Sequence, residues 1–128
     1  MSNADSFTAD SLTDIRVVCL CAAWCGVCRE FDPAFTALAQ SHPHASFHWV
    51  DVEDQADWVD ALEVDNFPTL LLGVNGTPVF YGTTLPHANV VERMIERAAD
   101  TAPLRGVEPE ALATMQALLK GLAEGKLG

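Results

Sequence analysis

The sequence predicts a single α/β domain, in which helices cover both faces of a central sheet. Residues 15–22 are apolar except for Arg16, which is typical of a strand buried on both faces. Apolar residues then recur at helical spacing from Val27 to Leu38. The Asn75-Gly76 pair between two apolar runs predicts a β-hairpin. A length of 128 residues suits one such domain with a real core.

The remaining elements follow from the same patterns. The helix that starts at Gly26 is expected to run to Gln40, with a kink at Pro33, because proline removes a helical hydrogen bond. Pro86 suits the first turn of a later helix. The further strands are expected at residues 46–52, 69–74 and 78–81. The further helices are expected at residues 54–62, from Pro86 onward and at residues 109–122. The helix from Pro86 is expected to bury Val91, Met94, Ile95 and Ala98.

Three segments are expected along the chain. Residues 1–14 are a polar N-terminal segment, either frayed or with a short helix over residues 7–12, and residues 15–101 form the domain itself. Residues 102–128 contain a linker and an additional amphipathic helix, whose apolar side packs on the same domain or, alternatively, on a partner. That apolar side consists of Leu112, Met115, Leu119 and Leu122.

Charge and composition limit the classes of partner. A formal net charge of −11 argues against nucleic acid and anionic membranes as partners. No apolar run approaches the length of about 20 residues that spans a membrane. Residues 1–14 lack the basic segment and apolar core of a signal peptide, and the four cysteines are not disulfide-dense. We therefore expect a cytoplasmic protein and a monomer.

Two cysteines stand between the first strand and the helix that follows it. Cys25 and Cys28 are three positions apart, so they can approach within bonding distance at the start of a helix. The first backbone N–H groups of a helix lack internal partners and make this end electropositive, which favours a thiolate. A strand, Cys-x-x-Cys and a helix in this order predict a reversible dithiol/disulfide site.

Structural zinc is the alternative for a Cys-x-x-Cys pair. A helix from Cys28 to Ser41 would place His42 about 20 Å from the cysteines, at about 1.5 Å per residue. Two further cysteines lie in a buried strand, where a closed tetrahedron with Cys25 and Cys28 is hard to build. The other candidate zinc ligands are Cys19, Cys21, His42, His44 and His48. The sequence therefore favours a redox site without a metal over a zinc site.

The motifs resemble those of the thioredoxin family. Trp24-Cys25-Gly26-Val27-Cys28, with Pro33 five residues on, is similar to the family's active site. Asn66-Phe67-Pro68-Thr69, followed by three leucines, resembles the segment with a cis-proline opposite the cysteines. Asn75-Gly76 and Gly82 fall where the family has its hairpin and a groove glycine. The resemblance covers residues 15 to about 100.

The resemblance implies a thioredoxin fold, with a mixed central sheet of four or five strands, flanking helices and an extra C-terminal helix. It implies a thiol–disulfide oxidoreductase that reduces or exchanges protein disulfides. Cys25 would be the nucleophile and Cys28 the resolving thiol, with no cofactor beyond their reversible disulfide. The expected partners are disulfide-containing proteins and a thioredoxin reductase or another thiol donor. The expected substrate-binding residues are Trp24, Gly26, Val27, Phe67, Pro68, Thr69 and Gly82.

Two departures from the family pattern affect this interpretation. Val27 stands where thioredoxins proper carry proline, and the dipeptide between the cysteines tunes the potential. Cys19 and Trp49 occupy the places of a buried aspartate and its lysine, which the resemblance implies help to move a proton. We expect Cys19 and Cys21 to be buried and reduced. The alternative is that this pair supplies a third thiol beneath Cys28, which exchanges with it.

A binding or assembly-assisting module with little redox turnover is the alternative function. An acidic run from Asp51 to Asp65, without lysine or arginine, predicts a solvated face. If this run borders the groove, it favours basic partners.

Overall fold

The computed structural model describes residues 13–83 and 87–127. The expected N-terminal helix at residues 7–12 and the expected helix start at Pro86 lie outside the described residues. Four strands form one sheet within this part of the chain, in the order β2-β1-β3-β4. They are β1 (Ile15–Cys21), β2 (Ala45–Asp51), β3 (Thr69–Val74) and β4 (Thr77–Thr83).

The sheet is mixed because β1 pairs in parallel with β2 and antiparallel with β3. β3 pairs antiparallel with β4 through the predicted hairpin. Asn75 and Gly76 both have positive φ, at 53° and 83°, which is the backbone of a type I′ turn and explains the Asn-Gly pair. The register places the end of β1 beside the start of β3, with Leu20 opposite Thr69.

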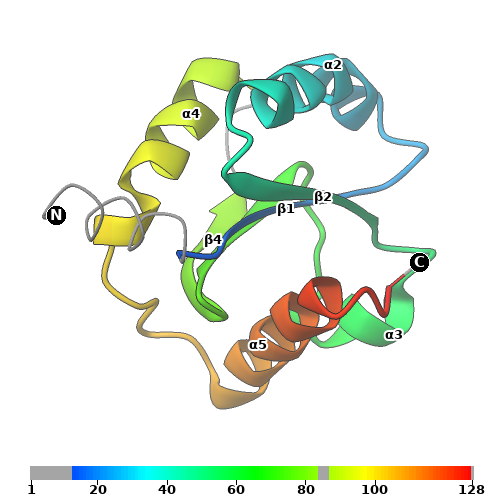
Figure 1. Cartoon of the computed structure of the whole chain (residues 1–128). Coiled ribbons are helices and arrows are strands. Elements are labelled where there is room, and N and C mark those ends of the chain that lie inside the picture. Colours follow the sequence, from blue (N-terminus) through cyan, green and yellow to red (C-terminus); the bar gives the residue numbers. More distant parts are fainter. Residues whose placement is uncertain (1–12, 84–86, 128) are drawn as a thin grey trace, which may run out of the picture.

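Helices cover the two faces of the sheet in pairs (Figure 1). The pair α2 and α4 lies on one side and the pair α3 and α5 on the other. Two short 3₁₀ turns, Asp60–Leu62 and Ala98–Asp100, continue α3 and α4. The helices are α2 (Gly26–Ser41), α3 (Ala56–Val59), α4 (Ala88–Arg97) and α5 (Pro109–Ala123).

The observed elements differ from the predicted ones mainly at their ends. α2 runs as one α-helix through Pro33. The helix expected at residues 54–62 is shorter, because only Ala56–Val59 is α-helical. The 3₁₀ turn that follows it ends at Glu63, whose backbone has a left-handed conformation. The predicted α/β class is confirmed, since a buried mixed sheet lies between two layers of helices.

Alternate residues of β1 face two separate cores. Val17, Cys19 and Cys21 belong to the core under α2 and α4, which also contains Phe31, Phe35, Val91 and Ile95. Val18 and Leu20 belong to the opposite core, which contains Val59 of α3 and Met115, Leu118 and Leu119 of α5. This period of two follows from the pleat of a strand.

The additional C-terminal helix packs on the sheet of the same domain. Met115, Leu118 and Leu119 are at most 1 % exposed, and Gly121 lies against Trp58. A Cβ atom on Gly121 would come within 2.6 Å of the Trp58 ring, so the glycine permits this close approach. The buried side of α5 contains Met115 and Leu119 of the predicted stripe and also Leu118, whereas Leu112 and Leu122 are only partly buried.

Candidate redox site

The end of β1 and the start of α2 position the cysteines. β1 ends at Cys21, and the Cys25 N–H donates to the Ala22 carbonyl at 3.0 Å, which turns the chain. Cys25 is the N-cap of α2, with extended backbone, and its carbonyl accepts the Arg29 N–H at 3.2 Å. Cys28 lies in the first turn of α2. The strand–cysteines–helix arrangement that the sequence predicts is therefore present.

The structure contains a disulfide between Cys21 and Cys28, and Cys25 is a free cysteine. The disulfide stands in place of the predicted Cys25–Cys28 pair. The prediction that Cys21 is buried is confirmed, since it is 0 % exposed, but the prediction that it is reduced is wrong. The physical reason is that the strand end and the first helical turn bring the Cα atoms of Cys21 and Cys28 to 5.9 Å, which suits a disulfide.

The sequence predicted Cys25 and Cys28 as the pair, with exchange between a strand thiol and Cys28 as the alternative. Spacing along the chain does not show how close the end of the strand comes to the first turn of the helix. The signal that could have found the pair is strand parity. Cys21 shares the side of β1 on which Phe31 and Phe35 of α2 pack, so its side chain points toward the start of that helix.

Cys19 is the second free cysteine and is fully buried, as predicted. Its Sγ lies 3.6 Å from Cys21 Sγ. Cys21 is disulfide-bonded and has no hydrogen on its sulfur, so Cys19 is the donor of this weak hydrogen bond. Burial, with a smaller contribution from the negative charge of Asp32, raises the pKa of Cys19 to about 12. Cys19 is therefore a neutral thiol at physiological pH.

Trp49 lies directly beside Cys19 in the register of β1 and β2. Its ring is 39 % exposed and packs edge-on against Phe35, at a centroid distance of 5.6 Å. A thiol and an indole therefore occupy the place for which the resemblance implies a carboxylate and an amine. Neither side chain can hold a charge there near neutral pH.

An aromatic surface flanks the free thiol of Cys25. Trp24 is 63 % exposed, and its ring meets Phe67 edge-on at 5.6 Å. Phe67 and Cys25 both pack against the core that contains Cys28. The Phe67–Pro68 peptide bond is cis, and it leads directly into β3. Two segments that are distant in sequence thus form one surface beside the thiol.

The other predicted substrate-binding residues differ in exposure. Gly26 and Val27 are exposed at the start of α2. Thr69 is buried, and its hydroxyl donates to the Asn66 carbonyl at 2.6 Å, so only its backbone can serve a substrate. Gly82 lies opposite Leu70 on β4. A Cβ atom there would meet Phe80 at 3.5 Å, an ordinary contact distance, so packing does not require glycine at this position.

Two acidic residues that the sequence analysis did not assign to the site contact the cysteine loop. Asp51 accepts the Ala23 N–H at 3.0 Å, and Glu53 accepts the Trp24 indole N–H at 3.2 Å. Asp51 also accepts the Glu53 N–H at 2.8 Å. A pocket of about 590 Å³ lies next to them, and Ala23, Trp49, Asp51 and Asp54 are among its lining residues. The acidic run therefore borders the site.

Of the candidate zinc ligands, Cys19 and Cys21 lie beside Cys28, whereas His42 and His44 lie together away from the cysteines. His42 lies at the far end of α2, where its Nε2 is 3.6 Å from Glu92 Oε2. Within residues 13–83 and 87–127, the side chains with metal-ligand atoms mutually within 4.8 Å are His42, Glu92 and Glu96. This group contains no cysteine.

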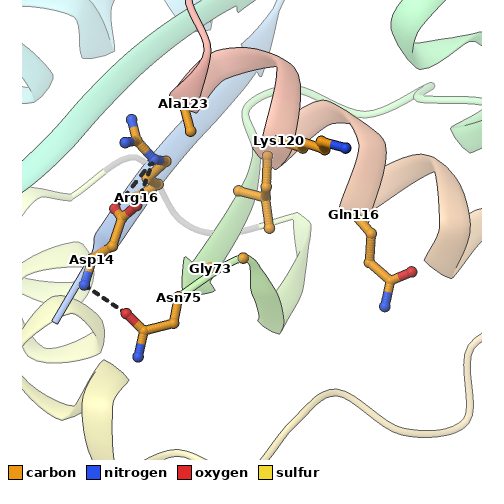
Figure 2. Close-up of a pocket in the computed structure, with 9 residues that line it drawn as sticks. Asp14, Arg16, Gly73, Asn75, Gln116, Lys120 and Ala123 are labelled. Atoms are coloured by element: carbon orange, nitrogen blue, oxygen red, sulfur yellow. Dashed lines mark hydrogen bonds and ion pairs between the residues drawn. The ribbon is translucent and has the colours of Figure 1, made fainter.

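A separate pocket of about 440 Å³ lies at the other end of β1 (Figure 2). Arg16 and Asp14 line it and form an ion pair with Nε–Oδ1 at 3.1 Å. Figure 2 also shows the Asp14 N–H directed at the Asn75 side chain, to which it donates at 2.8 Å. Arg16 and Cys21 are about 16 Å apart along the strand at about 3.3 Å per residue, so this pocket is not part of the redox site.

Sequence comparison places the same region among known redox proteins. The family model described as thioredoxin matches residues 2–96. A thioredoxin of Chlamydia pneumoniae is 30% identical over 97 residues, which cover 76% of this chain and 92% of that protein. Thioredoxin-1 of Saccharomyces cerevisiae is 38% identical over 63 residues, 49% of this chain and 61% of that protein.

Solved structures give the same result. The thioredoxin of Fasciola hepatica superposes with a TM-score of 0.62 at 25% identity, covering 75% of this chain and 91% of that one. The oxidised mitochondrial thioredoxin 3 of Saccharomyces cerevisiae gives a TM-score of 0.59 at 26% identity, covering 73% and 88%. The predicted fold, a mixed sheet flanked by helices, is thereby confirmed.

Proposed function

Since the chain belongs to the thioredoxin family and is a thiol–disulfide oxidoreductase, we propose that Cys25 is its nucleophile and Cys28 its resolving thiol. The single observation that carries this assignment is the contrast between the two sulfurs. Cys25 is free and partly exposed at the N-cap of α2, whereas Cys28 is 1 % exposed. A substrate disulfide can reach the first sulfur and not the second.

The reaction proceeds by two exchanges. The Cys25 thiolate attacks one sulfur of a substrate disulfide, forms a mixed disulfide and expels the other substrate sulfur as a thiolate. The Cys28 thiolate then attacks Cys25 Sγ, which releases the remaining substrate thiolate and joins Cys25 to Cys28. The unpaired N–H groups at the start of α2 stabilise negative charge on Cys25. The exchange uses cysteine sulfurs alone and needs no other cofactor.

Substrate contacts come from the surface around Cys25. Trp24 and Phe67 offer an apolar platform, while the backbone beside Pro68 at the start of β3 can pair with an extended peptide. Val27 and Gly26 leave the approach to the sulfur open, because both are exposed. Gly82 lies at the same end of the sheet, near the start of β3.

Disulfide-containing proteins are the substrates that we propose, with a preference for basic segments. Asp51, Glu53 and Asp54 lie beside the cysteine loop, and the net charge of the chain is −11, so basic segments are attracted. The Michaelis constant for a basic substrate should therefore rise with ionic strength.

A thioredoxin reductase or another thiol donor would return the chain to its reduced form. We propose a monomer that binds neither nucleic acid nor membrane, because its net charge is strongly negative. We also propose that it is cytoplasmic, because its cysteines are few. Among the described residues, the helices are too short or too polar to cross a bilayer.

The test is reduction of insulin disulfides, with dithiothreitol or thioredoxin reductase plus NADPH as the electron source. We expect the wild-type chain to accelerate the reaction over the donor alone. A folded chain that gives no acceleration with either donor would support the binding or assembly-assisting module instead.

A further inference from the structure

The structure adds Cys21, at the end of β1, to the two cysteines of the predicted site. Its sulfur is bonded to Cys28, seven residues further on, and both residues are at most 1 % exposed. Cys25 packs against the core that contains both of them and keeps a free, partly exposed thiol. The disulfide is therefore buried, while the accessible sulfur of Cys25 is not bonded to another sulfur.

We propose that Cys21 is a third redox-active cysteine, which takes Cys28 from the Cys25–Cys28 disulfide and leaves Cys25 free in the oxidised protein. This inference rests on the proposed function and extends it by one exchange within the chain. In this oxidised form Cys25 keeps a reactive thiol, whereas in a form with the Cys25–Cys28 disulfide it has none.

The additional step balances without an external oxidant other than the substrate disulfide. Substrate reduction gives two substrate thiols and the Cys25–Cys28 disulfide. The Cys21 thiolate then attacks Cys28 Sγ, the Cys21–Cys28 bond forms, and Cys25 leaves as a thiolate. The protons of Cys21 and Cys28 pass to the two substrate sulfurs. The net change is oxidation of Cys21 and Cys28 and reduction of the substrate, with Cys25 unchanged.

The positions of the sulfurs favour this direction of exchange. Cys25 leaves as an anion at the electropositive start of α2, where water also reaches it. The Cys21–Cys28 disulfide is uncharged, so its burial carries no penalty for a charge. The attack requires Cys21 to lose its proton in an apolar surrounding, so this transfer should be slower than the reduction of the substrate.

Cys19 does not compete for this role, although its sulfur is 3.6 Å from Cys21. The structure leaves Cys19 as a free thiol that donates a weak hydrogen bond to Cys21, and it is Cys21 that is bonded to Cys28. Cys19 and Cys21 lie on the same side of β1 and are equally buried. Cys19→Ala is therefore the matched control for Cys21→Ala.

A free Cys25 in the oxidised protein has a functional consequence. Its thiolate can attack a second disulfide while Cys28 is held by Cys21. No resolving thiol is then available, so the second substrate stays attached as a mixed disulfide. The reduced chain would thus act as a disulfide reductase, whereas the oxidised chain would bind a substrate covalently through Cys25.

The test is a disulfide map of the full chain. The reduced protein is oxidised with one molar equivalent of dithiodipyridine, left to equilibrate, and its remaining thiols are blocked with N-ethylmaleimide in denaturant. Chymotrypsin then cleaves after Leu20 and Trp24, which separates Cys19, Cys21 and the Cys25–Cys28 segment into different peptides. We expect residues 21–24 cross-linked to the peptide with Cys28, and N-ethylmaleimide on Cys25 and Cys19.

Alkylation under native conditions is the second readout. In the oxidised wild type and in Cys19→Ala, Cys25 should react within about threefold of its rate in the reduced protein. In Cys21→Ala the oxidised protein should react at least tenfold more slowly, because Cys25 stays bonded to Cys28. Thermal melting of each variant establishes that it is folded.

The wild-type map decides the question even if a variant fails to fold. A Cys25–Cys28 disulfide within one peptide, with N-ethylmaleimide on Cys21, would overturn the role of Cys21 and leave the proposed function standing. Four blocked cysteines without any disulfide, together with no insulin reduction, would overturn the proposed function as well.

Discussion

The two faces of the central sheet differ in chemistry, although they share the same strands. The face under α2 and α4 holds Cys19, Cys21 and Cys28, with Cys25 packed against them. Among the described residues, the buried core under α3 and α5 consists of valine, leucine and methionine. β1 supplies both faces by alternation. We therefore expect that substitutions on the second face change stability without changing the cysteine chemistry.

Removal of the accessible thiol should have the largest effect on activity. Cys25→Ser is expected to lower insulin reduction at least about a thousandfold, because the nucleophile is lost. Its melting temperature should change little, since serine is a favourable N-cap residue. Cys19→Ala, on the same face, should keep turnover within about twofold, since that thiol takes no part. Retention of more than a tenth of the activity by Cys25→Ser would place the nucleophile elsewhere.

Truncation on the opposite face should affect stability alone. Leu118→Ala removes a fully buried side chain of α5, so the free energy of unfolding should fall by about 2–5 kcal/mol. Turnover per folded molecule should stay within about twofold. Gln116→Ala, an exposed change on the same helix, should alter stability by less than about 0.5 kcal/mol. Denaturant unfolding measures both, and a Leu118→Ala protein of wild-type stability would contradict this packing.

Trp24 and Trp58 belong to opposite faces of the sheet and should respond differently to truncation. Trp24 is 63 % exposed beside Cys25, so Trp24→Ala should lower kcat/KM about 2–10-fold, mainly through KM, with little change in stability. Trp58 packs on Gly121 of α5, so Trp58→Ala should cost about 2 kcal/mol of stability and leave KM unchanged. Steady-state kinetics and thermal melting of both variants test these roles. A loss of stability in Trp24→Ala, or a raised KM in Trp58→Ala, would contradict them.

The smallest effect concerns the reactivity of Cys19. Because burial raises its pKa to about 12, only about one molecule in 10⁴ carries the thiolate at pH 8. Iodoacetamide should therefore modify Cys19 at least about a hundredfold more slowly than Cys25 in the reduced native protein. The rate should rise as the pH approaches 12, for as long as the protein remains folded. Equal rates at pH 8 would mean that Cys19 is open to solvent.

Local patterns were sufficient to predict most of the fold. β3 has the predicted bounds, and α2 starts at the predicted Gly26, because a continuous apolar run and helical spacing are properties of neighbouring residues. The Asn75-Gly76 turn follows from the positive φ that both positions require.

Contacts between elements were less accessible to sequence reasoning. The Cys21–Cys28 disulfide depends on how the end of β1 meets the first turn of α2. Asp51 reaches the cysteine loop because the parallel register places it beside Cys21. Neither relation is a spacing along the chain. Strand parity indicates which side of β1 Cys21 faces, but it does not show which residue Cys21 meets there.

Trapping of the mixed disulfide identifies the sulfur that attacks substrate, which we propose is Cys25. The Cys28→Ser variant is mixed with insulin, its free thiols are blocked, and the covalent adduct is digested with chymotrypsin and mapped by mass spectrometry. We predict an insulin chain on the peptide that begins at Cys25, in higher yield than for the wild type. An adduct on the peptide with Cys21 or Cys19, or no adduct from a folded variant, would show that Cys25 is not the attacking sulfur.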